Sequence, residues 1–255
     1  MIDLHCHILP GIDDGAQTEY DALDMACAAV ENGITKIVAT PHHKNGAYEN
    51  PKAQILKYVE VLNELLGSQG IPLEILPGQE VRIYGEIAQE IDNGALLTMN
   101  NGGHYVFIEF PSSQVPRYAK QLFYDMQLQG ITPIIVHPER NHEIQSNPML
   151  LYNFIKNGAL SQVTAASLLG RFGKKAHKLS VQIIENNLTH FIATDAHNTE
   201  GRGFLLQEAY ADITKLFGTD YTFMYQENAE LLLEDKVVNR EIPTQIKEKK
   251  FLGIF

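Results

Sequence analysis

Two pairs of metal-binding residue types occur in this 255-residue chain, each with a spacing of two. His5 and His7 form the first pair, and Asp195 and His197 form the second. Alternate residues of a β-strand face the same side, so each pair can direct both side chains at one ion. Neutral imidazoles and carboxylates suit Zn²⁺, Mn²⁺ and Fe²⁺, and two cysteines at Cys6 and Cys27 offer no thiolate pair. The spacing therefore indicates divalent-metal chemistry.

Further candidate ligands follow other short apolar runs of the chain. Glu109 lies between Ile108 and Phe110, where a carboxylate is costly unless it is paired in a salt bridge or bound to metal. The whole candidate set is His5, His7, Asp14, His42, Glu80, Glu109, His137, Asp195 and His197, with Asp13 as the substitute for Asp14. This is too many ligands for one ion, so the sequence predicts two or three ions.

Short β-rich runs alternate with amphipathic helical runs, and these elements must position the candidate ligands. The β-rich runs cover residues 2–7, 34–40, 73–81, 105–110, 131–137, 161–165 and 190–195. Helical patterns cover residues 18–33, 51–70, 86–92, 116–129, 149–157, 174–186, 203–217 and 229–233. Thr18 and Asp21 have the spacing of a capping box at the start of the first helix.

Repeated β-then-α units with short connections favour an α/β fold with a parallel sheet. Seven units without a Rossmann glycine fingerprint predict a closed, TIM-like (β/α)7 barrel in a single domain over residues 1–255. Six of the seven predicted strands deliver His, Asp or Glu to the rim that carries the site in such barrels, and only the 161–165 strand offers no ligand.

Composition excludes several other classes of protein. The chain carries 20 Lys+Arg against 31 Asp+Glu, a net charge of −11, which argues against a general nucleic-acid binder. A membrane-spanning helix needs about 18 consecutive apolar residues, and no apolar run in the sequence approaches that length. The N-terminus lacks the pattern of a secretory signal, and two cysteines make no disulfide scaffold, so we expect a cytoplasmic protein.

The motifs, taken in order, resemble those of the PHP (polymerase and histidinol phosphatase) superfamily. The matching segments are His5-Cys6-His7 with Asp13-Asp14-Gly15, Pro41-His42-His43, His137-Pro138-Glu139-Arg140 and Asp195-Ala196-His197. Within it, the opening residues 1–8 and the Asp195-Ala196-His197-Asn198 segment with Gly201-Arg202 are similar to the manganese-dependent tyrosine-protein phosphatases of bacterial capsule and exopolysaccharide operons. This resemblance spans residues 1 to about 212.

The resemblance implies a distorted (β/α)7 barrel with three metals, Mn²⁺ being the expected ion and Fe²⁺ or Zn²⁺ equally suited by ligand type. Glu80 would be the bridging carboxylate and Glu109 a ligand of the second metal. The implied substrate is phosphotyrosine on the tail of a cognate bacterial tyrosine kinase and on its protein substrates, in the control of capsule synthesis. Arg140 and Arg202 follow the ligand motifs and suit phosphate, although a surface salt bridge is the alternative for each.

Four other functions remain open from the sequence. A small-molecule phosphatase of the same superfamily, such as a histidinol-phosphate hydrolase, would have a nearly identical site. An amidohydrolase would need a lysine where strand four ends in Glu109. A metal-binding scaffold that only docks a kinase would not need the arginines, and a nuclease would be expected to carry a basic stripe. The basic Lys247–Lys250 cluster is interpreted as a solvated end.

Overall fold

The structure is a computed structural model that describes residues 1–247, so Lys249 and Lys250 of the C-terminal basic cluster lie outside the described residues. Its strands are β1 (Ile2–Cys6), β2 (Lys36–Ala39), β3 (His42–His43), β4 (Glu74–Pro77), β5 (Glu80–Arg82), β6 (Tyr105–Glu109), β7 (Thr132–Val136), β8 (Leu160–Thr164) and β9 (Phe191–Ala193). Its α-helices are α1 (Glu19–Glu31), α2 (Lys52–Gln69), α3 (Ile87–Asp92), α4 (Ala119–Leu128), α5 (His142–Ser146), α6 (Met149–Lys156), α7 (Ala165–Leu168), α8 (Gly173–Glu185), α9 (Leu206–Phe217) and α10 (Thr219–Leu233). Two 3₁₀ turns are η1 (Met99–Asn101) and η2 (Pro138–Arg140).

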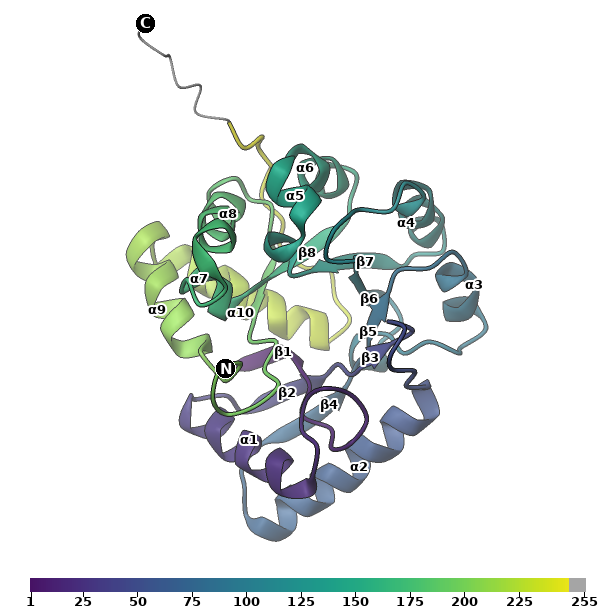
Figure 1. Ribbon diagram of the computed structural model, residues 1–255, viewed down its shortest axis with the longest axis vertical. Coiled ribbons are helices and arrows are strands. Elements are labelled where there is room, and N and C mark those ends of the chain that lie inside the picture. The colour runs from purple at the N-terminus through teal and green to yellow at the C-terminus, as the bar shows by residue number, and fades with distance from the viewer. Residues whose placement is uncertain (248–255) are drawn as a thin grey trace, which may run out of the picture.

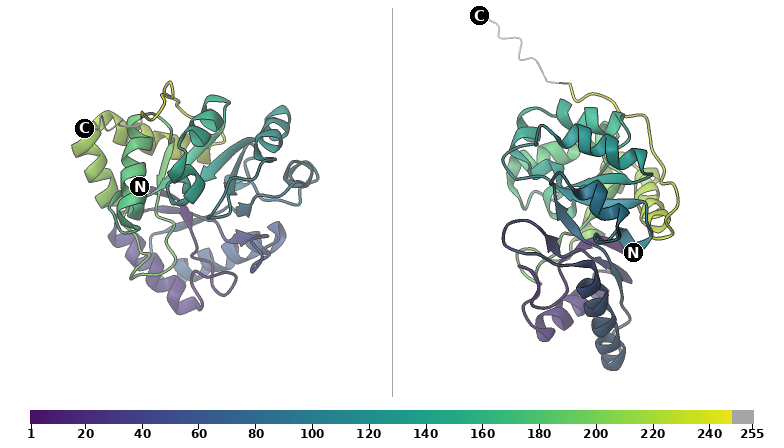
Figure 2. Two further views of the ribbon diagram at one scale, coloured as in Figure 1. Left: turned by 45° about the horizontal axis from the view of Figure 1, so that its top comes forward. Right: turned by 90° about the vertical axis from the view of Figure 1, so that its right-hand side faces the viewer.

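All strand pairs are parallel, which confirms the predicted α/β class. Among residues 1–247 the strands form two sheets, ordered β1-β2-β4 and β3-β5-β6-β7-β8-β9, rather than one closed barrel. Helices lie around the outside of the strands, with α1 and α2 beside the smaller sheet (Figure 1). The two further views show the same arrangement of helices around strands (Figure 2).

One predicted strand is divided into two and another is followed by a short strand that was not predicted, and these interruptions divide the sheet. The 34–40 run ends before Pro41, which has no N–H for the ladder, and the chain resumes beyond it as β3. The 73–81 run breaks at Gly78, where an added Cβ would lie 2.5 Å from a methyl carbon of Val38. These interruptions turn β3 and β5 away from β2 and β4 and into the larger sheet.

Hydrogen bonds join the two sheets again where β1 meets the end of β9. The Asp195 N–H donates to the His5 carbonyl at 2.8 Å, and the His7 N–H donates to the Ala196 carbonyl at 2.8 Å. The buried Asp3 carboxylate accepts from the Thr194 N–H at 2.9 Å. The first and last strands are therefore fixed side by side, with their carboxyl ends together.

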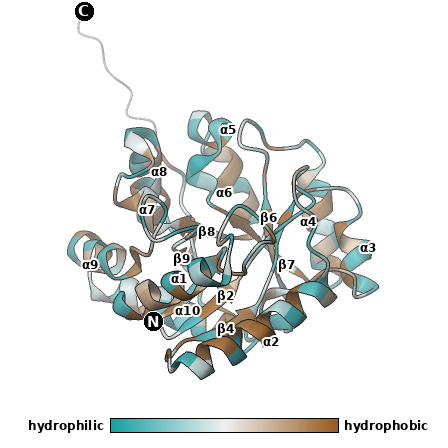
Figure 3. Ribbon diagram, turned by 60° about the horizontal axis from the view of Figure 1, so that its bottom comes forward, coloured by the Kyte–Doolittle hydropathy of each residue, from teal (hydrophilic) through white to brown (hydrophobic). Residues whose placement is uncertain are grey.

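The strands bury side chains on both of their faces. Inward-facing residues of β1, β2, β6, β7, β8 and β9 form one apolar cluster, and Ala229 and Leu232 of α10 cover it. The opposite faces pack against the surrounding helices in a second, larger cluster. Helix α2 shows how the helices contribute, because hydrophobic and hydrophilic segments alternate along it (Figure 3) and Ile55, Val59 and Leu62 are buried.

Helix boundaries agree with the sequence patterns except near the C-terminus and in two connections. The predicted capping box of Thr18 and Asp21 is confirmed at the start of α1. Helix α10 is longer than its 229–233 pattern, because buried Tyr225 and Asn228 extend its packed face. The short helices α5 and α7 were not predicted. No helix among residues 1–247 combines the length and apolar character needed to cross a bilayer.

His190 makes stability sensitive to acid at a place away from the predicted ligands. Burial lowers the pKa of this imidazole to about 3, and its Nδ1 accepts from the Ser161 N–H at 3.3 Å, which requires the neutral ring. The unfolded chain binds this proton near pH 6.5, so the folded state loses about 1.4 kcal/mol at pH 5.5 relative to pH 7.5. We expect His190→Gln to lack this component when urea unfolding is compared at both pH values in chelator. An identical pH dependence in the variant would contradict the assignment.

Candidate metal centre

The carboxyl ends of the strands bring all nine predicted ligands to one cluster. His5 lies in β1, His42 in β3, Glu80 in β5 and Glu109 at the end of β6. His7 and His137 directly follow β1 and β7, and Asp14 lies in the loop after β1. Asp195 and His197 lie in the segment after β9. Most of these side chains are buried, and Asp14 is the most exposed of them. Parallel strands explain this convergence, because their carboxyl ends meet at one edge.

Two imidazole nitrogens near β1 each lie close to two carboxylate oxygens. The Nε2 atoms of His5 and His7 are 3.3 Å apart. Each lies 3.3–3.5 Å from Glu80 Oε2 and Asp195 Oδ1. Tetrahedral ligands with bonds of about 2.1 Å would be separated by about 3.4 Å. The atoms of His5, His7 and Glu80 therefore suit one ion, and Asp195 lies beside both histidines.

The outer ring nitrogens of these two histidines are held by other side chains. His5 Nδ1 lies 2.9 Å from Gln162 Oε1, and His7 Nδ1 lies 2.7 Å from Asp13 Oδ2. With a proton on each Nδ1, both Nε2 lone pairs point at the shared centre, which is the usual arrangement behind metal-bound histidine. The sequence analysis did not single out Gln162, because it considered only His, Asp and Glu as ligands at the strand ends. The sign that could have identified it is a polar side chain inside a buried strand.

A second group forms around Asp14 rather than Asp13. Asp14 Oδ1 lies 3.3 Å from His42 Nε2 and 3.4 Å from His197 Nε2. Asp13 instead faces His7, and it also accepts from the backbone N–H groups of Gly15 and His42. The structure therefore favours Asp14 as the ligand and makes Asp13 the residue that orients His7.

A third group surrounds Glu80 on the side of β6 and β7. His137 Nε2 lies 2.7 Å from Glu80 Oε1, and His42 Nδ1 lies 2.8 Å from Glu80 Oε2. Glu109 Oε2 lies 3.9 Å from His42 Nδ1 and accepts from Arg82 Nε at 2.9 Å. Glu109 therefore forms the salt bridge that the sequence left open as an alternative to metal binding, and its partner is Arg82. Glu80 is shared by the first and third groups, and His42 is shared by the second and third.

Unusual backbone at two residues and a close approach at a third make this convergence possible. His137 has φ +36° and Asp195 has φ +53°, a left-handed conformation that is uncommon in residues other than glycine. His137 directly follows β7, Asp195 is the second residue after β9, and both turn their side chains into the cluster. Gly15 lies against His7 so closely that an added Cβ would be 1.9 Å from the His7 carbonyl oxygen. Only glycine at that position lets the Asp14 loop approach β1.

The charges of the cluster raise the pKa values of two imidazoles despite their burial. Burial alone would lower the pKa of His7, but the Asp13 carboxylate raises it well above its usual value. Burial likewise opposes the charge of Glu80, which raises the pKa of His42 to about 10. The neighbouring carboxylates therefore favour the protonated form of His7 and His42, whereas burial lowers the pKa values of His137 and His197.

Three buried carboxylates respond to the same field in different ways. Burial would raise the pKa of Glu80, but the charge of His42 holds it well below the usual range. The Arg140 guanidinium does the same for Asp195. Burial and the nearby Glu80 charge raise the pKa of Glu109 to about 7. Nearby positive charge therefore stabilises the anionic forms of Glu80 and Asp195, whereas burial and the charge of Glu80 outweigh the effect of Arg82 at Glu109.

Buried atoms that make no hydrogen bond support the fit of these residues to a divalent cation. Within residues 1–247, His42 Nδ1, Glu80 Oε2 and His197 Nε2 are buried and make no hydrogen bond. Their contacts are ion pairs, between His42 Nδ1 and Glu80 Oε2 at 2.8 Å and between His197 Nε2 and Asp14 Oδ1 at 3.4 Å. Native proteins rarely leave such atoms unsatisfied, and metal coordination is one way to satisfy them. Three clusters of these residues each place one ligand atom per residue within 4.8 Å of the others: His7, Asp14, His42 and His197; His5, His7 and Glu80; His42, Glu80 and Glu109.

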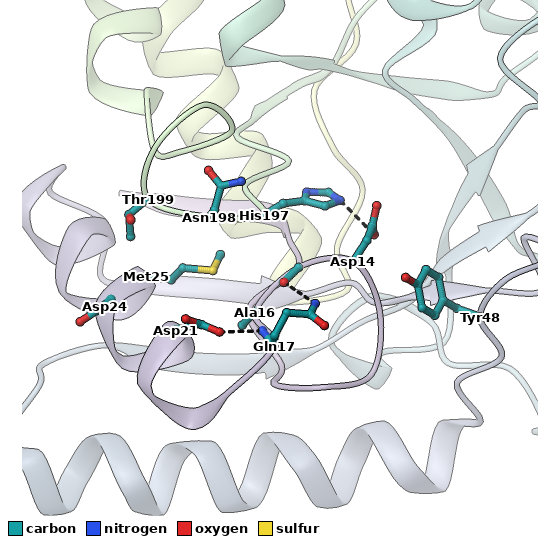
Figure 4. Close-up of a pocket in the computed structure, with 11 residues that line it drawn as sticks. Asp14, Ala16, Gln17, Asp21, Asp24, Met25, Tyr48, His197, Asn198 and Thr199 are labelled. Carbon is teal, nitrogen blue, oxygen red and sulfur yellow. Dashed lines mark hydrogen bonds and ion pairs between the residues drawn. The ribbon is translucent and has the colours of Figure 1, made fainter.

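Cavities open on two sides of the cluster. One, of about 520 Å³, lies beside Asp14 and His197 and is bordered by Asp21 and Asp24 of α1. Figure 4 shows Asp14 and His197 joined across its edge, with Tyr48 beyond them. The other, of about 330 Å³, is lined by His42, Glu109, Phe110, Ser112, Val136, His137, Pro138, Arg140, Asn141, Phe172, Asp195 and Arg202. The two cavities therefore reach different ligands of the same cluster: Asp14 and His197 in the first, and His42, Glu109, His137 and Asp195 in the second.

Both predicted phosphate-binding arginines line the second cavity. Arg140 Nη2 lies 2.6 Å from Asp195 Oδ2, and Arg202 Nη2 lies 3.0 Å from the same oxygen. Their alternative assignment as surface salt bridges is too simple, because the shared carboxylate is buried within the ligand cluster. Arg202 Nε is buried without a hydrogen-bond partner among the described residues. The Arg202 guanidinium therefore has at least one N–H group that no described residue uses as a hydrogen-bond donor.

Comparison with known proteins places this site in a family. The family described as "Capsular polysaccharide synthesis, CpsB/CapC" matches residues 1–234. The chain belongs to the CpsB/CapC family. This result confirms the predicted relationship to the tyrosine phosphatases of bacterial capsule synthesis.

Similar proteins cover the whole length of this CpsB/CapC chain. Tyrosine-protein phosphatase YwqE of Bacillus subtilis (strain 168) is 50% identical over 255 residues, 100% of both chains. The putative tyrosine-protein phosphatase CapC of Staphylococcus aureus is 42% identical, again over 100% of both. A chain from the crystal structures of YwqE from Bacillus subtilis and CpsB from Streptococcus pneumoniae, described as unique metal-dependent tyrosine phosphatases, has a TM-score of 0.94. It covers 97% of this chain and 100% of that one at 50% identity.

Gln162 supplies a test of the metal centre that leaves every proposed ligand in place. Gln162→Leu removes the partner of His5 Nδ1, and we expect the affinity for Mn²⁺ to fall about 10- to 100-fold. The measurement is competition with a fluorescent chelator. Ser161→Ala on the same strand removes a hydroxyl that donates to the Leu188 carbonyl, so it serves as the control. Equal Mn²⁺ affinities in both variants would contradict this role for Gln162.

Proposed function

We infer that this chain is a metal-dependent protein-tyrosine phosphatase of the CpsB/CapC family that does not use a cysteine nucleophile. The observation that carries this inference is a cavity with two guanidinium groups placed directly beside a cluster of buried imidazoles and carboxylates. Guanidinium groups suit phosphate oxygens, and the cluster suits divalent ions. Cys6 is buried and its pKa is raised by burial, which is the opposite of an activated thiolate.

The proposed ligands are the nine residues His5, His7, Asp14, His42, Glu80, Glu109, His137, Asp195 and His197. The convergent nitrogen and oxygen atoms support two or three divalent ions, with Mn²⁺ proposed because of the resemblance to the PHP superfamily. Bound ions of this kind lower the pKa of water and neutralise charge on a phosphoryl group. Gln162 and Asp13 would keep the histidine lone pairs directed inward, and Arg82 would hold Glu109.

We also propose that the two sheets together make a distorted (β/α)7 barrel in one domain. The shared inward apolar cluster supports this arrangement, because side chains from both sheets fill it. The hydrogen bonds between β1 and the end of β9 support it as well. In this interpretation, β2 with β3 and β4 with β5 are each one kinked strand of the barrel.

The protein's own residues can bind and orient a phosphate ester in the second cavity. Arg140 and Arg202 would hold the phosphoryl oxygens, since each touches Asp195 through one terminal nitrogen only. Phe172 lines the same cavity, and its ring lies 5.0 Å from the Arg140 guanidinium carbon. It is partly exposed and can contact a substrate ring. A phenolate with a parent pKa near 10 leaves readily, so a strong general acid is not required.

The proposed substrates are phosphotyrosine residues of a bacterial tyrosine kinase and its protein targets. The family's connection with capsular polysaccharide synthesis supports a role in controlling that process. A cytoplasmic location is proposed from the sequence, and neither nucleic-acid binding nor membrane insertion is part of the proposal. The test is hydrolysis of phosphotyrosine, phosphoserine and histidinol phosphate after chelation and return of Mn²⁺, Fe²⁺ or Zn²⁺. Preference for histidinol phosphate would favour the small-molecule alternative.

Arg140 is predicted to act on substrate rather than on metal content. Arg140→Ala should lower kcat/KM for an aryl phosphate about a hundredfold, because a preorganised donor to the phosphoryl group is lost. Arg140→Lys keeps the charge near Asp195 and should recover only part of the activity. Metal stoichiometry, measured by mass spectrometry on the same samples, should stay unchanged. Unaltered kcat and KM in Arg140→Ala would remove its phosphate-binding role.

Phe172 is predicted to favour aryl over alkyl phosphates. Phe172→Ala should raise KM for a phosphotyrosine peptide about tenfold through the loss of an aromatic contact, whereas inhibition by inorganic phosphate should change little. Phe172→Tyr keeps an aromatic ring and serves as the matched control. If the inhibition constant of phosphate rises as much as the peptide KM, Phe172 only positions Arg140.

A further inference from the structure

One long stretch of the chain has no acidic residue at all. Between residues 144 and 184 there is no aspartate or glutamate, although the whole chain carries 31 and has a net charge of −11. Five basic residues lie in the same stretch: Lys156, Arg171, Lys174, Lys175 and Lys178. The charge is therefore distributed very unevenly along the chain, because this stretch is positive whereas the whole chain is negative.

Four of these cations lie together at the surface where α8 begins. Arg171 precedes the helix, and Lys174, Lys175 and Lys178 lie in its first two turns. All four residues are exposed. Salt bridges within residues 1–247 engage other cations, such as Lys44, and none of these four. We refer to Arg171, Lys174, Lys175 and Lys178 as the α8 basic face.

The α8 basic face lies next to the cavity that holds the arginines. Phe172, between Arg171 and the first residue of α8, lines that cavity. Helix α8 packs against η2, which carries Arg140. A hollow of about 470 Å³ extends along this surface, lined by Lys175 and Lys178 on one side and by residues of α5 on the other. His142 in this hollow directly follows Asn141, which lines the cavity.

The other cavity beside the metal cluster has the reverse charge. The first cavity is bordered by Asp14, Asp21 and Asp24. An anionic chain whose phosphate enters beside Arg140 would be repelled on that side and attracted along α8. Fields of this kind act over a Debye length, about 8 Å at physiological ionic strength, so they reach several residues on either side of a bound phosphotyrosine.

We propose that the α8 basic face is a docking surface for an acidic segment of the substrate protein that flanks the phosphotyrosine. The proposal rests on the phosphatase function inferred above and adds the chemistry of the partner. Its physical basis is charge complementarity: exposed, unpaired cations beside the cavity on an otherwise acidic molecule. Such complementarity selects partners and speeds their encounter.

The test compares two phosphotyrosine peptides with the holoenzyme. One has aspartate and glutamate on both sides of the phosphotyrosine, and the other has asparagine and glutamine at the same positions. The wild type should show a higher kcat/KM for the acidic peptide, and this preference should shrink as NaCl is raised. Lys174→Glu/Lys178→Glu should lower the ratio of acidic to neutral kcat/KM about tenfold, mainly through KM.

A matched control reverses two exposed lysines elsewhere. Lys57 lies on α2 and Lys215 on α9, and both are exposed. Lys57→Glu/Lys215→Glu makes the same change in net charge and should leave the ratio as in the wild type. An equal fall in both double variants would show a net-charge effect and overturn the proposal. Equal hydrolysis of both peptides by the wild type would also overturn it, whereas no hydrolysis of either would overturn the phosphatase function itself.

Discussion

The constraint on which this structure depends is the burial of many like charges around one point. Five carboxyl groups and five imidazoles meet at the carboxyl ends of the strands: Asp13, Asp14, Glu80, Glu109 and Asp195, with His5, His7, His42, His137 and His197. Carboxylates this close repel one another unless cations lie between them. Arg82, Arg140 and Arg202 supply part of that charge. The carboxylates also favour the protonated forms of His7 and His42, and divalent ions can supply positive charge at the same place.

Much of the local structure follows from that requirement. Breaks at Pro41 and Gly78 turn β3 and β5 so that His42 and Glu80 face the centre. Left-handed backbone at His137 and Asp195 aims two further side chains inward. The stability for such strained positions comes from the continuous apolar packing on both faces of the strands. A rigid scaffold thus holds a site that would not assemble alone.

Sequence patterns predicted the elements, and the gathering of the candidate ligands in one cluster, better than they predicted how the strands pair. Strands repeat as apolar runs and ligands stand at their ends, so His5, Glu109 and Asp195 could be found from position alone. Strand breaks at Pro41 and Gly78 depend on contacts with distant residues, which no local pattern contains. The choice between Asp13 and Asp14 and the contact of Gln162 with His5 depend on distances across the fold. The contact of Arg82 with Glu109 also depends on such a distance, so the sequence alone does not indicate it.

The buried site and the surface around it have different roles. The proposed metal ligands and the two arginines explain how a phosphate ester would be bound and how its negative charge would be neutralised. The uneven surface, acidic beside α1 and basic along α8, explains from which side an anionic protein segment would approach. The central claim is that the buried cluster is built for divalent cations. Anomalous diffraction from crystals grown with Mn²⁺ tests it most directly. The account predicts peaks between His5, His7, Glu80 and Asp195 and beside His42, whereas no anomalous density within this cluster would contradict it.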